Sequence, residues 1–170
     1  MRIVKLVALF LFACLWTAAI VPAKALDNSA NALAAEIKKD KELHDRALGI
    51  VQAEQARAKQ PLCPKAQSTL DINECYSAEV TTTDTNYTKL IRALGALLRS
   101  GDGSKAAPAR IPFDDAETAW HSYREMACKA AGDQYEGGTI RPSIEMGCSL
   151  TLTRHHIDEL WVLYSDLGTR

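Results

Sequence analysis

Four cysteines offer the most definite chemistry in this sequence. Cys63, Cys75, Cys128 and Cys148 are separated by 11, 52 and 19 intervening residues. In a short exported chain, which the N-terminal segment below indicates, an even number of cysteines predicts two disulfides. None of the spacings is Cys-x-x-Cys, so neither a redox motif nor a zinc ribbon is predicted. Three pairings remain open at this stage.

The other reactive side chains form no recognisable catalytic set. His155 and Glu159 lie four residues apart, a spacing that two metal ligands on one helix face can use. Two such residues without a His-Glu-x-x-His pattern are more typical of a solvated helix face. No Ser-His-Asp or Cys-His arrangement is visible. We therefore predict no catalytic residues, no metal, no cofactor, and a protein that is not an enzyme.

A Trp-x-x-Tyr-Arg segment contains residue types that often anchor interfaces, namely Trp120, Tyr123 and Arg124. Trp120 and Tyr123 also fit the buried stripe of a helix, and we expect them to pack in the core. Arg124 has two interpretations: it could hold carbonyls or a carboxylate in a loop, or it could contact a ligand.

The segment from Tyr135 to Met146 is the other candidate for binding a partner. Its two adjacent glycines permit close approach of the backbone, and its polar residues offer varied contacts. The alternative is a connection shaped by the cysteine bridges on either side. The candidate residues in this segment are Tyr135, Glu136, Gly137, Gly138, Thr139 and Arg141.

The first 25 residues have the pattern of a secretory signal peptide. Arg2 and Lys5 precede an apolar run from Leu6 to Val21, and Ala23-Lys24-Ala25 supplies the small residues of a cleavage site. The run is shorter than the roughly 20 residues that span a bilayer as a helix. We predict cleavage after Ala25 and a periplasmic or secreted protein. Membrane association through an uncleaved segment or through a lipid on Cys14 stays open.

Cleavage would leave a mildly acidic protein. Removal of Arg2, Lys5 and Lys24 with the signal segment changes the formal charge from −1 to −4. No Arg or Lys run of the kind that follows a phosphate backbone is present, so nucleic acid is not an expected partner.

Hydrophobic periodicity predicts helices and no strands in the mature chain. Residues 29–58 are rich in helix formers but have a thin apolar stripe, which predicts a helix that is loosely packed or projects from the core. Ser68 and Asp71 resemble a capping box before a second helix, whose apolar residues recur every three or four positions as far as Leu98.

Two further helices are predicted after a loop over residues 100–112. The third begins near Phe113 and ends at Gly132, which can adopt a left-handed conformation, and its buried stripe is Phe113, Ala116, Trp120, Tyr123 and Ala127. The fourth covers about residues 149–166. The expected fold is an all-α, disulfide-stapled bundle of three core helices, with an N-terminal helical extension (residues 26–60) before the four-cysteine domain (residues 61–167).

The arrangement of these motifs resembles the LprI-type lysozyme-inhibitor family. The resemblance covers roughly residues 63–163 and consists of Cys63, Cys75, Asp84, Trp120-x-x-Tyr123-Arg124-x-x-x-Cys128, Gly137-Gly138-Thr139, Cys148 and Leu152-Thr153-Arg154. It implies a non-enzymatic exported protein that occludes the sugar cleft of a muramidase. The alternative is an envelope scaffold or accessory protein without lysozyme activity, in which residues 29–58 recruit a partner as an amphipathic helix. Neither the oligomeric state nor the class of lysozyme follows from the sequence.

Overall fold

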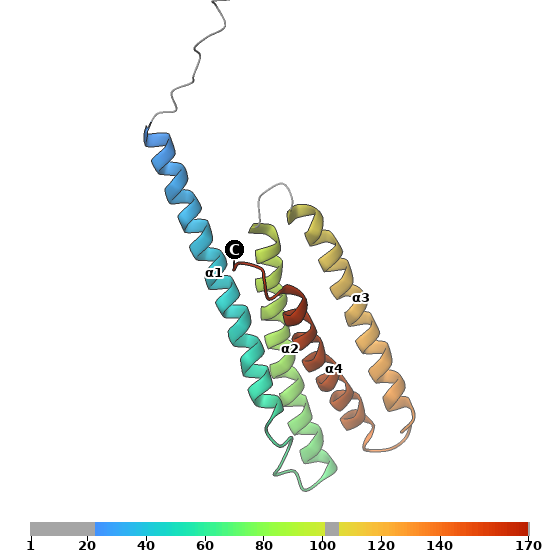
Figure 1. The fold of residues 1–170 in the computed structure, drawn as a ribbon. Coiled ribbons are helices and arrows are strands. Elements are labelled where there is room, and N and C mark those ends of the chain that lie inside the picture. Colours follow the sequence, from blue (N-terminus) through green and yellow to red (C-terminus); the bar gives the residue numbers. More distant parts are fainter. Residues whose placement is uncertain (1–22, 101–105, 170) are drawn as a thin grey trace, which may run out of the picture. The chain divides into compact units, whose positions relative to one another are not determined.

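The computed structural model describes residues 23–100 and 106–169, and these ranges contain four helices and no strand. The helices are α1 (Ala23–Ala58), α2 (Thr69–Ser100), α3 (Ala106–Asp133) and α4 (Arg141–Tyr164) (Figure 1). The all-α prediction is confirmed. The described residues belong to two units, one up to Ala34 and one from Ala35 onward, and the helical contacts below belong to the second unit. Residues 1–22, with most of the predicted signal segment and Cys14, lie outside the described residues.

The hydrophobic core lies between α2, α3 and α4 and includes one face of the second half of α1. Leu90, Leu94, Ile157 and Leu160 are at most 2% exposed, and around them pack further buried residues that include Phe113, Leu97, Ala47 and Val51. The prediction that residues 29–58 pack loosely is therefore wrong for the second half of that segment, because Ala47 and Val51 lie fully inside the core. The thin stripe is sufficient because these side chains are small and allow a close approach.

The start of α2 is set by the predicted capping box. The Ser68 hydroxyl accepts a hydrogen bond from the Asp71 backbone N–H at 3.1 Å, and the Asp71 carboxylate accepts one from the Ser68 N–H at 3.0 Å. These reciprocal bonds satisfy backbone groups that the first turn leaves without partners. The predicted apolar face is also confirmed, since Thr83, Tyr87 and Leu94 are buried.

Both later helices begin earlier than the sequence indicates. The segment expected to be a loop over residues 100–112 becomes helical from Ala106, and α3 continues through Pro112. The expected connection over residues 133–147 becomes helical from Arg141, and Pro142 occupies the first turn of α4, where its missing N–H costs nothing. Gly147 suits its position inside α4 because it lies close to Tyr76. A Cβ there would approach the Tyr76 ring to 3.0 Å.

Details of α3 also differ from the prediction. Tyr123 is 55% exposed and Ala116 is exposed, so neither belongs to the buried stripe that Phe113, Trp120 and Ala127 do enter. Gly132 lies within α3 and does not have a left-handed backbone. A Cβ at Gly132 would come within 2.3 Å of the Glu145 side chain. The glycine therefore allows α4 to approach α3 closely, which is a packing role.

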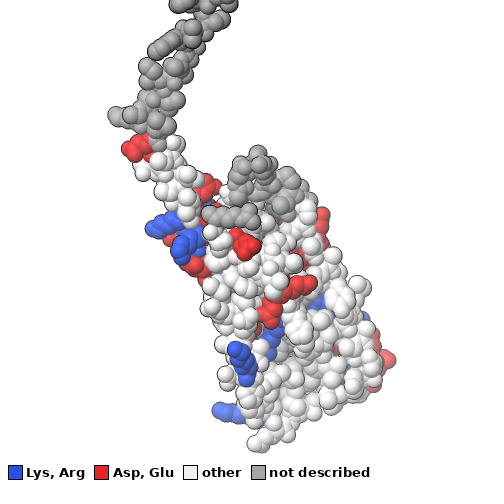
Figure 2. Space-filling model, viewed as in Figure 1, with Lys and Arg blue, Asp and Glu red and all other residues white. Residues whose placement is uncertain are grey.

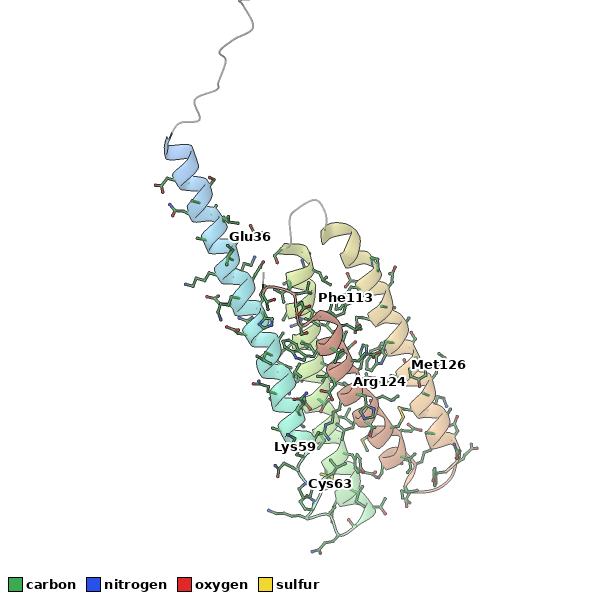
Figure 3. The ribbon with its side chains drawn as sticks, viewed as in Figure 1. Glu36, Lys59, Cys63, Phe113, Arg124 and Met126 are labelled. Carbon is green, nitrogen blue, oxygen red and sulfur yellow. A yellow bond between two sulfur atoms is a disulfide. The ribbon has the colours of Figure 1, made fainter. Side chains whose placement is uncertain are left out.

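The two disulfides pair neighbours in sequence, Cys63 with Cys75 and Cys128 with Cys148. The first closes the connection before α2, and the second joins α3 to α4 across their connection. α2 begins, α3 ends and α4 begins at the same end of the bundle, where Cys63 also lies (Figures 1 and 3). Both disulfides therefore lie at one end of the bundle, and the pairing that the sequence left open is resolved.

The two disulfides should stabilise the domain to different extents. Loop-closure entropy predicts a loss of about 3 kcal/mol for replacing either pair by serine, with a slightly larger loss for the longer Cys128–Cys148 loop. Cys63 has a φ of 54°, a left-handed conformation that a non-glycine residue adopts at a cost, so removing its bridge also relieves strain. We expect Cys128→Ser/Cys148→Ser to lower the free energy of unfolding in urea more than Cys63→Ser/Cys75→Ser. A larger loss of unfolding free energy for Cys63→Ser/Cys75→Ser would contradict this expectation.

Candidate functional site

The connection between α3 and α4 is the best exposed of the predicted binding segments. Residues 134–140 are all exposed, and Tyr135 and Ile140 are 45% and 46% accessible. The Gly138 N–H donates to the Tyr135 carbonyl at 2.9 Å and closes a four-residue turn. Gly137 occupies the third position with a φ of 78°, which favours glycine because a Cβ would be strained there. The Gly-Gly pair thus shapes a turn that presents Tyr135, Glu136 and Thr139 to solvent.

Arg141 fixes the base of this turn. Its guanidinium donates to Asp133 at the end of α3 at 2.6 Å and to Glu145 in α4 at 2.9 Å. The hydrogen bond to Glu145, with the charges of Asp133 and Glu145, raises the pKa of Arg141 above its usual value. The Cys128–Cys148 bridge joins the same two helices, with a Cα–Cα distance of 5.4 Å. Both ends of the exposed turn are therefore held, which lowers the entropy that it would lose on binding.

Arg124 is buried and does not belong to this exposed turn. Only 8% of the residue is exposed, and its Nη1 donates to the Asp84 carboxylate at 2.6 Å and to the Thr153 hydroxyl at 2.7 Å (Figure 3). Asp84, Arg124 and Thr153 come from α2, α3 and α4, so one guanidinium joins three helices. The carboxylate partner lies in a helix and not in the predicted loop. The contact of Arg124 with a partner protein stays a prediction, and its internal role is visible in the structure.

A second polar cluster surrounds His156. The ring stacks on Trp120 at a centroid distance of 4.0 Å, and its two nitrogens lie 3.1 Å and 3.0 Å from the carboxylates of Glu117 and Glu159. Burial disfavours the charged imidazole, but the hydrogen bonds to Glu117 and Glu159 outweigh it, so the pKa of His156 is raised. The Tyr87 hydroxyl donates to Glu117 at 2.7 Å, and burial together with this bond raises the tyrosine pKa.

A ring of four charges joins α1 to α2 and α4. Glu54 is 2% exposed and accepts hydrogen bonds from Arg57, Thr83 and Asn86. Glu79 accepts from Arg57 at 2.7 Å and from Arg154 at 3.0 Å, and the Arg154 Nε lies 3.6 Å from Glu54. Two carboxylates and two guanidiniums thus neutralise one another, as buried charges require.

These clusters position helices and leave no evident reacting group. Both ring nitrogens of His156 contact carboxylates, those of Glu117 and Glu159, whereas the neighbouring His155 is exposed. The predicted pair of His155 and Glu159 is therefore replaced by a contact between His156 and Glu159. Among the described residues, no three His, Cys, Asp or Glu side chains are placed to hold a metal ion.

The fold and its turn define a small disulfide-stapled helical domain, and the comparison with known proteins shows the family to which it belongs. Residues 63–160 match the family described as lysozyme inhibitor LprI, which is more than half of the chain, so this protein belongs to that family. It is also 31% identical over 111 residues to the uncharacterized protein R02472 of Rhizobium meliloti (strain 1021), covering 62% of this chain and 80% of that protein. No solved structure matches.

The family match begins after α1 and contains the four cysteines, the exposed turn and the Asp84–Arg124–Thr153 group. The expected division into an extension (residues 26–60) and a domain (residues 61–167) stays a prediction. The sequence did not identify Glu54, Glu117 and His156 as important. A charged residue at a core-facing helical position, such as Glu54 three residues after Val51, was the available signal.

Removing the Glu54 carboxylate should destabilise the domain strongly. Glu54→Ala leaves Thr83 and Asn86 without a buried acceptor and removes the carboxylate 3.6 Å from Arg154, and we expect a loss of about 2–3 kcal/mol in the free energy of unfolding. The matched control is Glu42→Ala, an exposed position on the same helix, which should change stability by less than about 0.5 kcal/mol. Chemical denaturation followed by circular dichroism measures both. Equal effects of the two substitutions would contradict the role of the charge ring.

The His156 cluster predicts a decline in stability on the alkaline side. Because the folded pKa is raised, the stabilisation from protonated His156 is complete below the unfolded value near 6.5 and is lost as pH rises through the folded pKa. His156→Gln should reduce this pH dependence of the unfolding free energy, whereas His155→Gln, at an exposed position, should leave it unchanged. Urea denaturation from about pH 5.5 to 9 tests this prediction. An unchanged slope in His156→Gln would contradict it.

Proposed function

We propose that this protein is exported and inhibits a lysozyme by occluding its sugar-binding cleft without chemistry of its own. The observation on which the proposal rests is the match to the lysozyme inhibitor LprI family over residues 63–160. Export follows from the signal pattern in residues 1–25, with cleavage after Ala25. Within the described residues, no helix is both long and apolar enough to span a bilayer.

The inhibitory surface that we propose is the turn between α3 and α4. Its exposed residues Tyr135, Glu136 and Thr139 project from a base that Arg141 and the Cys128–Cys148 bridge hold in place. A tethered convex turn with an aromatic residue suits insertion into a concave enzyme cleft, because little order is lost on binding. The net charge of −4 after cleavage favours encounter with a cationic lysozyme. The visible face carries scattered charges of both signs (Figure 2).

The scaffold alternative receives less support from the structure. It requires residues 29–58 to offer an apolar helix face to a partner. The face with Ala47 and Val51 already packs into the core of this chain, although Ile37 is 53% exposed. Recruitment of a partner by the second half of this helix would therefore compete with the bundle itself, and only the exposed first half, with Ile37, remains open to a partner.

Lysis assays with the oxidised chain from Leu26 onward test both the activity and the surface. The protein should slow lysis by at least one of a c-, g- and i-type lysozyme. Tyr135→Ala should weaken inhibition by about tenfold or more, as loss of an aromatic anchor does. Tyr123→Ala is the matched control, because Tyr123 is equally an exposed tyrosine but lies on α3 outside the turn, and it should inhibit like the parent.

The outcomes separate the two parts of the proposal. No inhibition of any lysozyme in the panel would refute the inhibitory function. Inhibition that is insensitive to Tyr135→Ala would refute the turn as the binding surface and leave the function standing.

A further inference from the structure

Three basic side chains on neighbouring positions of α1 and α2 have no acidic partner within the described part of the chain. Arg46 comes from α1, and Lys89 and Arg92 come from α2, where their spacing of three places them on one face. All three residues are exposed. Lys41, by contrast, pairs with Asp45 at 2.8 Å, so surface cations of this protein do find carboxylates where they are available.

The same basic residues line two adjoining hollows. One, of about 480 Å³, is bounded by Thr81, Asp84, Thr85, Thr88, Lys89 and Arg92. The other, of about 210 Å³, is bounded by Leu43, Arg46, Lys89, Arg92 and Ala93. Lys89 and Arg92 line both hollows, the first on α2 and the second between α1 and α2, so the two hollows share their basic groups. We refer to the two hollows together as the α1–α2 groove.

The threonines of the groove can act only as hydrogen-bond acceptors toward a ligand. Thr81, Thr85 and Thr88 each donate their hydroxyl hydrogen to the backbone carbonyl four residues earlier, at 2.8 Å. Their oxygen lone pairs remain available, whereas their protons are committed. A bare anion gains nothing from such oxygens, because it also brings only acceptors. A ligand with hydroxyl donors can form hydrogen bonds to these oxygens.

The remaining walls refine the chemistry of the ligand. Asp84 is the acidic residue of the groove, and its carboxylate is paired with Arg124 at 2.6 Å, which offsets its repulsion of an anion. Leu43 is half-buried and Ala93 is buried, so they provide an apolar floor beside Arg46. Such a floor suits the C–H face of a sugar ring.

We propose that the α1–α2 groove binds an anionic saccharide, with Arg46, Lys89 and Arg92 on its acidic groups and the three threonine oxygens accepting from its hydroxyls. This ligand class supplies all three features that the groove requires, namely negative charge, hydroxyl donors and an apolar ring face. The groove is separate from the turn at Tyr135, and its positive charge disfavours a cationic lysozyme. The site therefore goes beyond the proposed inhibition and would hold the protein on an acidic glycan.

Titration calorimetry with the chain from Leu26 onward tests the groove with three soluble probes. Oligogalacturonate is an anionic saccharide, maltohexaose a neutral one, and sulfate an anion without hydroxyl donors. Oligogalacturonate should bind about tenfold more tightly than either of the others, because it alone satisfies both the cations and the threonines. Its affinity should fall as sodium chloride is raised, since the basic residues are exposed.

Variants with matched charge assign the binding to the groove. Lys89→Gln/Arg92→Gln should weaken oligogalacturonate binding about tenfold or more, because two of the three cationic contacts are lost. Lys39→Gln/Lys59→Gln removes the same charge from exposed positions that do not line the hollows, and it should bind like the parent. Thr85→Val should weaken oligogalacturonate binding and leave any sulfate binding unchanged. Circular dichroism confirms that each variant is folded.

Each remaining outcome would overturn the proposal. Equal losses in the two double variants would mean that only net charge matters. Equal affinity for sulfate and oligogalacturonate would indicate an anion site without saccharide recognition. Sedimentation with phosphatidylglycerol vesicles that depends on Lys89 and Arg92, without oligogalacturonate binding, would indicate a membrane surface instead. None of these outcomes depends on lysozyme inhibition, so the two proposals can fail independently.

Discussion

Charged side chains inside a small helical bundle must find partners on neighbouring helices, and this constraint fixes how the domain is assembled. An unpaired buried charge costs several kcal/mol, which is a large share of the stability of a single small domain. Glu54, at 2% exposed, has such partners only if α1 places it against Thr83 and Asn86 of α2. Arg124 has its partners only if Asp84 and Thr153 meet it from two other helices. The relative registers of the helices follow from these bonds.

This arrangement explains why residues typical of the family lie inside the domain. Asp84, Arg124 and Thr153 are far apart in sequence, yet they form one hydrogen-bonded group that α2, α3 and α4 share. Trp120 lies beside them, with the Arg124 guanidinium 5.2 Å from its ring centroid. Such residues specify the framework on which a surface is displayed. The proposed binding surface, at Tyr135 to Thr139, shares Gly137-Gly138-Thr139 with the motif but not Tyr135 or Glu136, so the fold can be kept while the surface residues change.

The sequence predicted those features that depend on local patterns. The Ser68–Asp71 capping box, the buried face of α2 and the fold class are all correct, because each follows from residues within a few positions of one another. It failed where tertiary contacts override local propensity. Pro142 and Gly147 indicate a loop, but one is tolerated in the first turn of α4 and the other packs against Tyr76. Gly132 likewise indicates a helix end and instead permits contact with Glu145.

The partners with which charged residues pair could also not be predicted from the sequence. Glu54 and Arg154 are 100 positions apart, and no spacing rule brings them together. His156 and Glu159 are close in sequence, but the cluster depends on Glu117 and Trp120 from α3. A helical period identifies which residues face inward. It does not identify which inward polar residue of one helix meets which residue of the next, because that depends on the packing of the whole bundle.

The same reasoning applies to surfaces and explains how one chain can suit two ligands of opposite charge. A net charge of −4 is a property of the whole mature chain, whereas a ligand in contact responds to charges within about one Debye length, roughly 8 Å at physiological ionic strength. Lys89 and Arg92 share a face of α2, and Arg46 joins them only because α1 packs alongside. No run of basic residues in the sequence predicts such a group. Net charge therefore affects how a lysozyme would be encountered, while the local assembly of helices decides what the α1–α2 groove can hold.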